Sequence, residues 1–407
     1  MRICICDYSG HPFQVQLSRE LARRGNDVLH LFFSEFQTPH GTLHVTPDDP
    51  ATLSIEAVSL GRPFAKYSLI KRRWQEIEIG RHISIRMTAF RPEMMVGCNL
   101  PIDTLGEVLK SSRAHNVPFV FWQQDIYSKA IRSILQRKFG VLGRLVGEYY
   151  HRLERRAAIL SDAVVVIADR FKEELISEFG VSETKITVLE NWAPLNQITP
   201  RPKVNPWSIA HGFAGSNLIL YTGTLGMKHN LAPILALAEA VRHRPDTQIV
   251  VTSEGPSAEY LRTQAAAAGL DRLSVLPFQP FEQYSDVLGS AEVLIATIEA
   301  DAGGFSVPSK VLSYLCAARP IVISAPESNL ASQILNSTGA GRAVPPGDQT
   351  SFIAAVIEFM NDKDARLRCG AAARAYAEEN FEIGAISDRF DAIFTAVLAH
   401  ASIPSGR

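Results

Sequence analysis

The residues best suited to chemistry form a glycine-rich loop that leads into the start of a helix. Backbone N–H groups of Gly303–Phe305 can approach a ligand closely, and Pro308 suits the entry to a helix that opens at Ser309 and Lys310. The helix dipole, the Ser309 hydroxyl and the Lys310 ammonium all favour negative charge at this end. The segment predicts a phosphate-binding site, and the same residues also fit a plain helix cap with a turn.

A second loop of similar character runs from Tyr221 to Asn230, after a predicted strand and before a predicted helix. Gly223 and Gly226 allow close approach of the backbone, and Lys228 can neutralise a diphosphate. The other interpretation of Lys228 is a solvated lysine on a surface turn. Two positive, glycine-rich loops on one rim of a sheet fit a diphosphate leaving group better than either loop does alone.

Size and composition limit what these loops can belong to. A chain of 407 residues is too long for one ordinary core and predicts two domains. The formal net charge of -1 argues against a nucleic-acid binder. The five cysteines form no C-x-x-C pair, as is typical of reduced, structural cysteines in a cytoplasmic protein. The first ten residues do not read as a signal peptide, and no apolar run reaches the ~20 residues of a membrane span, so we expect any membrane contact to be peripheral.

Strand-like and helix-like runs alternate almost from end to end, which predicts an α/β protein with two doubly wound, Rossmann-like parallel sheets. The predicted strands are 2–6, 28–33, 94–96, 119–122, 163–167 and 186–189 in the first half, and 218–221, 248–252, 273–276, 293–298 and 321–324 in the second. Four prolines between Pro194 and Gly212 predict an interdomain linker at 196–212. It separates an N-terminal domain at 1–195 from a C-terminal domain at 213–380, with a last helical segment at 381–407.

Ligands bind beyond the carboxyl ends of the strands in such sheets. We therefore expect the loops at Gly10, Gly223, Ser253, Phe278 and Gly303 to converge on a cleft across which the two domains face each other.

Several motifs together resemble the family-4 glycosyltransferases of the GT-B fold, and are most similar to bacterial envelope and exopolysaccharide sugar transferases. In the second half they are 223–228, 277–279, 308–310 and 319–320, and in the first half 122–125, 153–155, 163–168 and 190–192. The resemblance implies a transferase of the EC 2.4 class, hexosyl or related. It would bind a nucleoside-diphosphate sugar mainly through the C-terminal domain and a glycan or lipid-linked glycan acceptor mainly through the N-terminal one.

The resemblance also implies roles for individual residues. Lys228 matches the lysine that neutralises the donor diphosphate, and Thr224 stands where many members have an arginine, so Lys310 is the candidate for that missing phosphate contact. Phe278 lies where the family contacts the nucleobase. The donor and phosphate residues would be Gly10, Gly223, Thr224, Lys228, Gly303, Gly304, Phe305, Ser309 and Lys310.

One departure concerns the paired glutamates with which many relatives hold the donor sugar and ribose. One register places Gly303 and Val311 at the two positions, and the other places Phe305 and Ser313 there. Neither supplies the pair. Ser313 is the candidate for a ribose hydroxyl, and Glu299 or Asp301 for the donor sugar, although acids at strand ends are also ordinary solvated residues.

Glycosyl transfer requires stabilisation of charge on the departing phosphate, which two lysines and a helix N-terminus can supply without a metal or cofactor. The resemblance implies that anomeric configuration is retained by attack on the front face. The donor phosphate, Asp125 or His11 can assist the acceptor hydroxyl. Alternatively, Asp125 is an N-cap for the helix that follows it, and His11 only lines a turn.

Two N-terminal segments, 66–86 and 129–156, mix basic with apolar residues. They suit an anionic membrane at the inner face of the cell envelope, or are helices with one face on the sheet and the other in water. A final helix at about 381–399 resembles the C-terminal helix that packs back on the N-domain in GT-B enzymes.

Three alternatives were weighed. The first βα loop lacks the G-x-G-x-x-G fingerprint of a nicotinamide oxidoreductase. A GT-B nucleotide-sugar epimerase and a non-catalytic sugar- or nucleotide-binding protein stay open.

Overall fold

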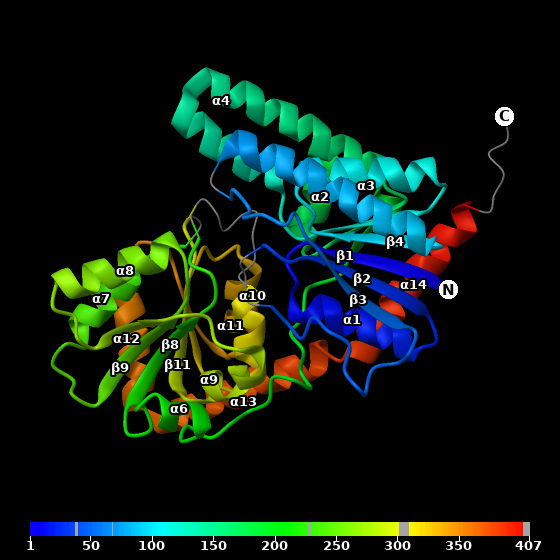
Figure 1. Ribbon diagram of the computed structural model, residues 1–407. Helices are drawn as coiled ribbons and strands as arrows, with labels where there is room; N and C mark the ends of the chain where they lie inside the picture. Colours follow the sequence, from blue (N-terminus) through cyan, green and yellow to red (C-terminus); the bar gives the residue numbers. More distant parts are fainter. Residues whose placement is uncertain (37–39, 67, 227–228, 301–308, 402–407) are drawn as a thin grey trace. The chain divides into compact units, whose positions relative to one another are not determined.

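The computed structural model describes residues 1–36, 40–66, 68–226, 229–300 and 309–401 (Figure 1). The chain forms two compact units. Unit 1 comprises Met1–Asn191 together with Ile383–Arg407, and unit 2 comprises Trp192–Glu382. Each unit is built around one parallel sheet, so the predicted α/β class with two doubly wound sheets is confirmed.

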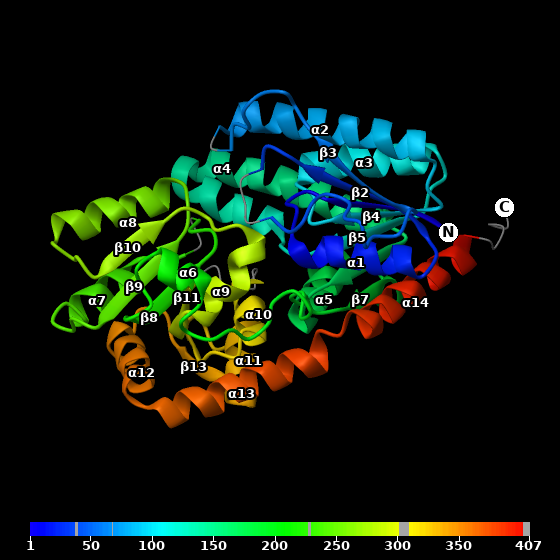
Figure 2. The same cartoon turned by 60° about the horizontal axis from the view of Figure 1, so that its bottom comes forward.

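The sheet of unit 1 has the strand order β3-β2-β1-β4-β5-β6-β7, with every described pair parallel. Its strands are β1 (Arg2–Asp7), β2 (Asp27–Phe33), β3 (Leu53–Val58), β4 (Met94–Cys98), β5 (Phe119–Gln123), β6 (Ala163–Val166) and β7 (Ile186–Val188). Its helices are α1 (Pro12–Arg23), α2 (Leu69–Phe90), α3 (Ile102–Ala114), α4 (Tyr127–Leu160), α5 (Asp169–Glu174) and α14 (Ile383–Ala401), with short helical turns η1 (Leu175–Phe179) and η2 (Glu183–Lys185). Figure 2 shows α1 and α14 on one side of this sheet and α2 and α3 on the other.

Burial on both faces explains why these strands read as continuous apolar runs. All five residues of β4 and of β5 are buried. The apolar residues on one side of the last helix are also buried, and the Phe390 ring lies 4.9 Å from the Trp122 ring at the centroids. Helix α14 therefore belongs to the core of unit 1, although it follows unit 2 in the sequence.

The sheet of unit 2 has the order β10-β9-β8-β11-β12-β13, again with parallel pairs. Its strands are β8 (Asn217–Thr222), β9 (Thr247–Thr252), β10 (Leu273–Leu276), β11 (Ala291–Thr297), β12 (Ile321–Ser324) and β13 (Gly341–Val344). Its helices are α6 (Pro206–Ala210), α7 (Ala232–Ala240), α8 (Pro256–Ala267), α9 (Tyr284–Gly289), α10 (Ser309–Cys316), α11 (Leu330–Thr338), α12 (Gln349–Asn361) and α13 (Lys363–Asn380), with the turn η3 (Phe281–Gln283).

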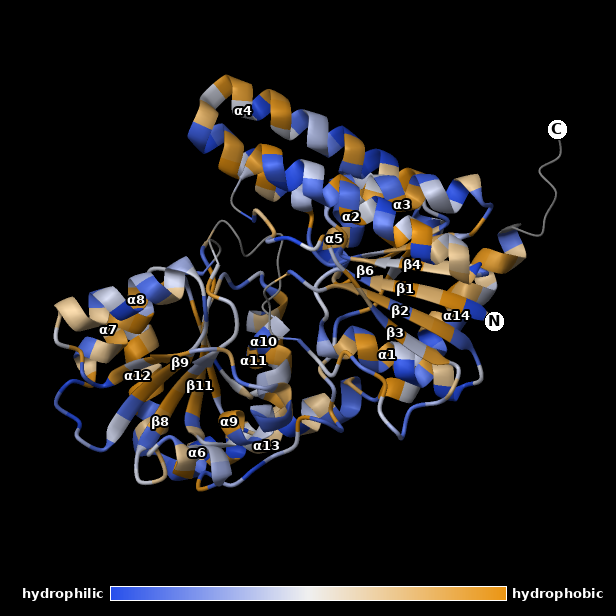
Figure 3. Cartoon of the chain, viewed as in Figure 1, coloured by the Kyte–Doolittle hydropathy of each residue, from blue (hydrophilic) through white to orange (hydrophobic). Residues whose placement is uncertain are grey.

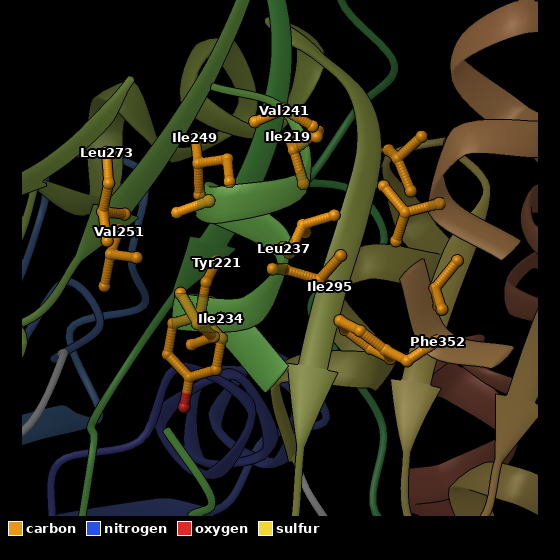
Figure 4. Packing of buried hydrophobic residues seen from close by; sticks show 14 of the residues in the cluster. Ile219, Tyr221, Ile234, Leu237, Val241, Ile249, Val251, Leu273, Ile295 and Phe352 are labelled. Carbon is orange, nitrogen blue, oxygen red and sulfur yellow. The ribbon is translucent and has the colours of Figure 1, made fainter. Parts of the chain in front are cut away.

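One apolar cluster fills the space between this sheet and the helices α7 and α12 (Figure 4). Ile219 and Ile295 face Leu237 of α7 and Phe352 of α12, all with no exposed surface. Figure 3 shows the strands of both sheets as mainly hydrophobic, whereas the helices alternate between the two colours. The carboxyl ends of the strands in unit 2 are thus held by a continuous core.

Two strands were not predicted, and both lie at a sheet edge. In β3 the middle residues are exposed or half-buried and include Glu56. In β13 the sequence is Gly-Arg-Ala-Val, and a Cβ on Gly341 would lie 1.9 Å from the Ile321 carbonyl oxygen. The apolar pattern of these two edge strands is weak, so periodicity alone misses them, whereas the edge strands β7 and β10 were predicted.

The predicted linker at 196–212 needs correction, because this segment is folded as part of unit 2. Asn205 caps α6 by accepting from the Ser208 N–H at 3.0 Å. Its amide also donates to the carbonyl oxygen of Asp286 at 2.8 Å, and Trp207 is buried. Prolines that suggested a flexible connection instead lie in a packed segment with an ordered helix start.

Candidate functional site

The strand order of unit 2 reverses between β8 and β11. From β8 the chain builds outward through β9 and β10, and from β11 through β12 and β13 on the other side. Open parallel sheets bind ligands beyond the carboxyl ends of their strands at such a switch point. The loop that follows β8 begins at Gly223, and the connection after β11 leads to α10 at Ser309. The described ends of both predicted phosphate loops therefore adjoin this point.

Lys310, in the first turn of α10, reaches across to the end of β8. Its Nζ donates to the Tyr221 hydroxyl at 2.5 Å, lies 4.3 Å from the centroid of the Tyr221 ring and is 3.4 Å from the Thr224 carbonyl oxygen. Burial raises the pKa of Tyr221 well above its usual range, so the phenol keeps its proton and donates it to Thr224 O at 3.1 Å. Figure 4 shows the Tyr221 hydroxyl pointing out of the apolar cluster.

Gly223 makes room for this arrangement. Its φ of +112° is unfavourable for residues with a side chain, and a Cβ there would lie 3.1 Å from Cε of Lys310. Its N–H donates to Thr252 O at 3.0 Å, which ties the loop to β9. The glycine thus fixes the turn and leaves space for the lysine side chain.

His229 is a residue of this site that sequence reasoning missed. Its Nε2 lies 3.3 Å from Lys310 Nζ, and its Nδ1 lies 2.9 Å from the Gly226 N–H and 3.3 Å from the Gly226 carbonyl oxygen. If Nδ1 accepts from the Gly226 N–H, the proton of a neutral ring is on Nε2, and two donors then face each other at Lys310 and His229. If Nε2 accepts from Lys310, the proton is on Nδ1 and donates to the carbonyl oxygen.

Polar side chains behind the loop hold the two elements together. Thr222 N donates to the Tyr314 hydroxyl of α10 at 2.9 Å, and Thr252 Oγ1 donates to Thr222 Oγ1 at 2.7 Å. Burial raises the pKa of Tyr284 to about 12, while hydrogen bonds from the side chains of Thr222 and Ser313 oppose the rise. Ser313, predicted to bind ribose, therefore has a partner inside unit 2.

The other predicted residues of unit 2 lie along the same edge. Phe278 follows β10 and is half-buried, with its N–H donating to Glu254 Oε1 at 3.1 Å. Glu299 follows β11 and is half-buried, and Ser309 is exposed at the start of α10. Five predicted residues lie outside the described part of the chain: Lys228, Asp301, Gly303, Gly304 and Phe305.

In unit 1 the loop after β1 is organised around Asp7. This buried carboxylate accepts from the N–H of Ser9 at 3.0 Å and from the N–H of His11 at 2.6 Å. Burial raises the pKa of Asp7 to about 7, although backbone hydrogen bonds, including one from Gly10, oppose the shift. The His11 ring stacks on Phe13, with centroids 5.7 Å apart. Amides that were expected to face donor phosphates thus point to a carboxylate.

Gly10 itself has a packing role. Its φ is +71°, its carbonyl oxygen accepts from Gly41 N at 3.0 Å, and an added Cβ would lie 2.6 Å from Leu43 Cδ1. The segment around residues 40–43 therefore covers the turn at Gly10. These contacts give Gly10 a packing role, and its phosphate role stays a prediction.

Asp125 does not cap the following helix. Its Oδ2 accepts from Asn99 Nδ2 at 3.2 Å, and its N–H donates to Asn99 Oδ1 at 3.1 Å. The N–H groups of Tyr127 and Ser128, at the start of α4, instead donate to the buried Glu154 at 3.0 and 2.9 Å. The N-cap interpretation of Asp125 is wrong, and this carboxylate lies beside Asn99 at the carboxyl edge of the first sheet.

In the described parts of the chain, no group of three or more His, Cys, Asp or Glu side chains is placed to hold a metal ion. The sequence Asp362-Lys363-Asp364 lies at the start of α13, where Asp362 accepts from Ala365 N at 2.9 Å. Asp362 is thus the N-cap of α13, and this Asp-x-Asp sequence belongs to a helix start and not to a group of metal ligands.

Comparison with known proteins identifies the family. The model for "Glycosyltransferase Family 4" matches residues 13–197, and the model for "Glycosyl transferases group 1" matches residues 207–376. Together they account for most of both units, and the chain belongs to the family-4 glycosyltransferases with the GT-B fold. The resemblance found in the sequence is confirmed.

A curated relative is a probable glycosyltransferase, WbjE, from Pseudomonas aeruginosa. It is 22% identical over 244 residues, which cover 60% of this chain and 60% of WbjE. The match thus spans about 60% of the length of that relative.

Solved structures share the fold at low sequence identity. HepE from Anabaena, in complex with UDP and glucose, has a TM-score of 0.70 at 14% identity and covers 97% of this chain and 99% of its own. Sucrose-phosphate synthase from Thermosynechococcus elongatus has a TM-score of 0.73 at 14% identity, covering 98% and 100%. WaaG, a glycosyltransferase involved in lipopolysaccharide biosynthesis, has a TM-score of 0.65 at 16% identity and covers 100% of both chains.

Proposed function

We propose that this chain transfers a hexosyl or related sugar from a nucleoside-diphosphate sugar to a glycan or lipid-linked glycan acceptor. The observation that carries the proposal is the meeting of Lys310 and His229 beside Gly223 at the switch point of unit 2. The complexes of HepE with UDP and with UDP-glucose support a donor of this class. WaaG supports a role in building envelope polysaccharide.

One of the two protonation states of His229 suits this point to a diphosphate. With Nε2 protonated, Lys310 Nζ and His229 Nε2 are two donors 3.3 Å apart that cannot satisfy each other. An oxyanion in contact with both atoms accepts from each and removes the conflict. The N-terminus of α10 adds its favourable dipole at the same place.

The proposed reaction follows from this charge distribution. The bond from the anomeric carbon to the donor phosphate oxygen breaks, and the acceptor hydroxyl oxygen bonds to that carbon from the same face, so configuration is retained. The acceptor proton moves to the departing phosphate. Lys310 and His229 stabilise the charge that grows on the diphosphate, so we propose that no metal or cofactor takes part.

The remaining contacts are assigned by position. We propose that Glu299 meets hydroxyls of the donor sugar and that Phe278 meets the nucleobase, because both follow the carboxyl ends of their strands. Lys228 stays a candidate for the second diphosphate contact. Asp125 and His11 stay candidates on the acceptor side, with Asn99 available to orient the Asp125 carboxylate.

We also propose that the enzyme works in the cytoplasm, at the inner face of the membrane if its acceptor is lipid-linked. Two other activities are compatible with a nucleotide-sugar site: epimerisation of the donor, and binding without catalysis. Neither has an observation of its own in the described residues.

The test is calorimetric titration of the full chain with UDP-, GDP- and ADP-sugars, followed by incubation of the tightest donor with candidate acceptors. We expect one nucleotide class to bind, and the matching free diphosphate to compete. Mass spectrometry of the acceptor should show added sugar, and proton NMR the retained anomeric configuration. No binding of any donor rules out the proposal, inversion of a donor carbon without acceptor indicates an epimerase, and binding with neither reaction indicates a silent protein.

A further inference from the structure

Helix α4 is a hairpin of two helical arms. Gly140 has a φ of 56° and a ψ of -128°, and there the chain reverses, as Figure 1 shows at the upper edge of unit 1. The two arms approach closely. A Cβ on Gly143 would lie 1.9 Å from the Leu135 carbonyl oxygen, and one on Gly147 would lie 2.8 Å from Arg132 Cα. Glycine at these positions lets the backbones pack directly.

The base of the hairpin is fixed to the sheet. The buried Glu154 of the second arm accepts from the N–H of Tyr127 in the first arm and from Gln123 Nε2 at the end of β5, both at 3.0 Å. The hairpin is therefore held at its base, and its tip, residues 134–146, projects from unit 1 (Figure 1).

The tip exposes large apolar side chains that the fold does not use. Val141 is 76% exposed, Leu142 72% and Leu145 62%. The start of α2 extends the same surface, with Ile70 74% and Trp74 65% exposed. The two helices are joined where Arg73 donates to the Tyr149 hydroxyl at 3.0 Å. Exposed apolar surface of this density marks a site of interaction.

The charge of the hairpin tip indicates which partner its exposed surface binds. The tip carries three basic residues, Arg137, Lys138 and Arg144, and no Asp or Glu, whereas Lys129 at the base is ion-paired with Glu174 and Glu178. The Lys138 ammonium lies 5.5 Å from the centroid of the Phe139 ring. A second copy of the hairpin would bring like charges together, which opposes self-association. An anionic bilayer offers phosphate for the basic groups and acyl chains for the apolar ones.

We propose that the hairpin tip and the first turns of α2 dock unit 1 on an anionic lipid surface. In the described residues, no helix is long and apolar enough to cross a membrane, so the contact is peripheral. Val141 and Leu142 enter the interface, while Lys138 and Arg144 stay at the level of the headgroups. The inference does not rest on the transferase activity, because it concerns a surface of unit 1 alone.

The test is co-flotation of the full chain with vesicles of phosphatidylcholine, with and without phosphatidylglycerol, at low and high salt. Two variants separate the contributions. One carries Val141→Ser, Leu142→Ser and Leu145→Ser, and the other carries Lys138→Gln and Arg144→Gln. A matched control carries Ile209→Ser and Leu367→Ser, which are 61% and 59% exposed on unit 2.

We expect binding to anionic vesicles that weakens with salt. The apolar variant should bind at least tenfold more weakly. The charge variant should bind about 25-fold more weakly, at roughly fivefold for each of the two basic groups near the surface. The control should bind as the unaltered chain does. The inference is overturned if the unaltered chain does not bind, if binding ignores phosphatidylglycerol, or if both tip variants bind normally. It also fails if sedimentation velocity shows a dimer that only the apolar variant dissociates, because the surface then joins two copies.

Discussion

The loops after β1 and after β8 occupy the same place in their sheets, next to the point where the strand order reverses, yet different groups lie in them. After β1 the backbone amides converge on the buried carboxylate of Asp7. After β8 the turn at Gly223 makes room for the ammonium of Lys310.

The difference lies in what each loop offers an anion. An anion brought to the β1 loop finds its amides engaged and a carboxyl group beneath them, whereas one brought to the β8 loop finds a lysine and a histidine ring. A glycine in a βα loop is therefore weak evidence for a phosphate site. What the amides already bind, and which side chain lies over the glycine, decide the matter.

The largest expected effect comes from Lys310→Met, which removes the cation and keeps most of the apolar stem over Tyr221. We expect kcat/KM to fall by about 10²- to 10³-fold, the usual loss when one group that stabilises a departing charge is removed. Steady-state kinetics with the donor found by calorimetry measures it. Lys363→Met, an exposed lysine at the start of α13, is the matched control. Equal kcat/KM in both variants would remove Lys310 from the site.

A pair of glycine substitutions sharpens the comparison. Gly10→Ala and Gly223→Ala each place a side chain at positive φ, and each should lower the free energy of unfolding by about 1–3 kcal/mol. Only Gly223→Ala should also weaken donor binding, because its Cβ meets Lys310 whereas that of Gly10 meets Leu43. Thermal unfolding and donor titration measure the two effects. Weaker donor binding in Gly10→Ala would support a phosphate role for the loop after β1.

The buried Asp7 predicts a pH effect confined to unit 1. Its pKa of about 7 exceeds the ordinary value of 3.8, so between these values the folded unit holds a proton that the unfolded chain has lost. Stability therefore decreases as pH rises through this window, by up to ~1.4 kcal/mol per pH unit for one such group. Glu154, with its pKa raised to about 7 by burial, acts in the same direction.

Urea unfolding of unit 1 at several pH values tests this prediction. Asp7→Asn should reduce the change in the free energy of unfolding with pH by the contribution of one group. Asp271→Asn, which alters an exposed acid of unit 2, should leave that pH dependence unchanged. A slope that Asp7→Asn does not alter would mean that this carboxyl is ionised in the folded unit across the whole range.

Sequence reasoning reached the fold because buried parallel strands are continuous apolar runs, and it failed at β3 and β13, where edge positions relax that pattern. It identified Lys310 from two local signals, a proline and the predicted start of a helix. Asp7 carried a local signal as well, since an aspartate just before a Ser-Gly turn commonly accepts from nearby amides.

The contacts that were missed join residues far apart in the chain. Lys310 meets Tyr221 and His229 only because α10 packs over the end of β8, across more than eighty residues of sequence. Glu154 caps the start of its own helix only because Gly140 folds that helix back on itself. Neither partner can be chosen by spacing, since each depends on the path of the chain between them.

The smallest expected effect distinguishes the two protonation states of His229. His229→Leu removes the proposed N–H donor and should weaken donor binding about fivefold, the worth of one hydrogen bond. His229→Gln keeps an N–H that can reach the same anion and should recover most of that loss. If the ring only positions Lys310 by accepting from it, both variants should instead leave donor affinity near normal, since Lys310 keeps its contact with Tyr221. Calorimetry on the two variants therefore tells whether the diphosphate meets one donor, Lys310, or two, Lys310 and His229.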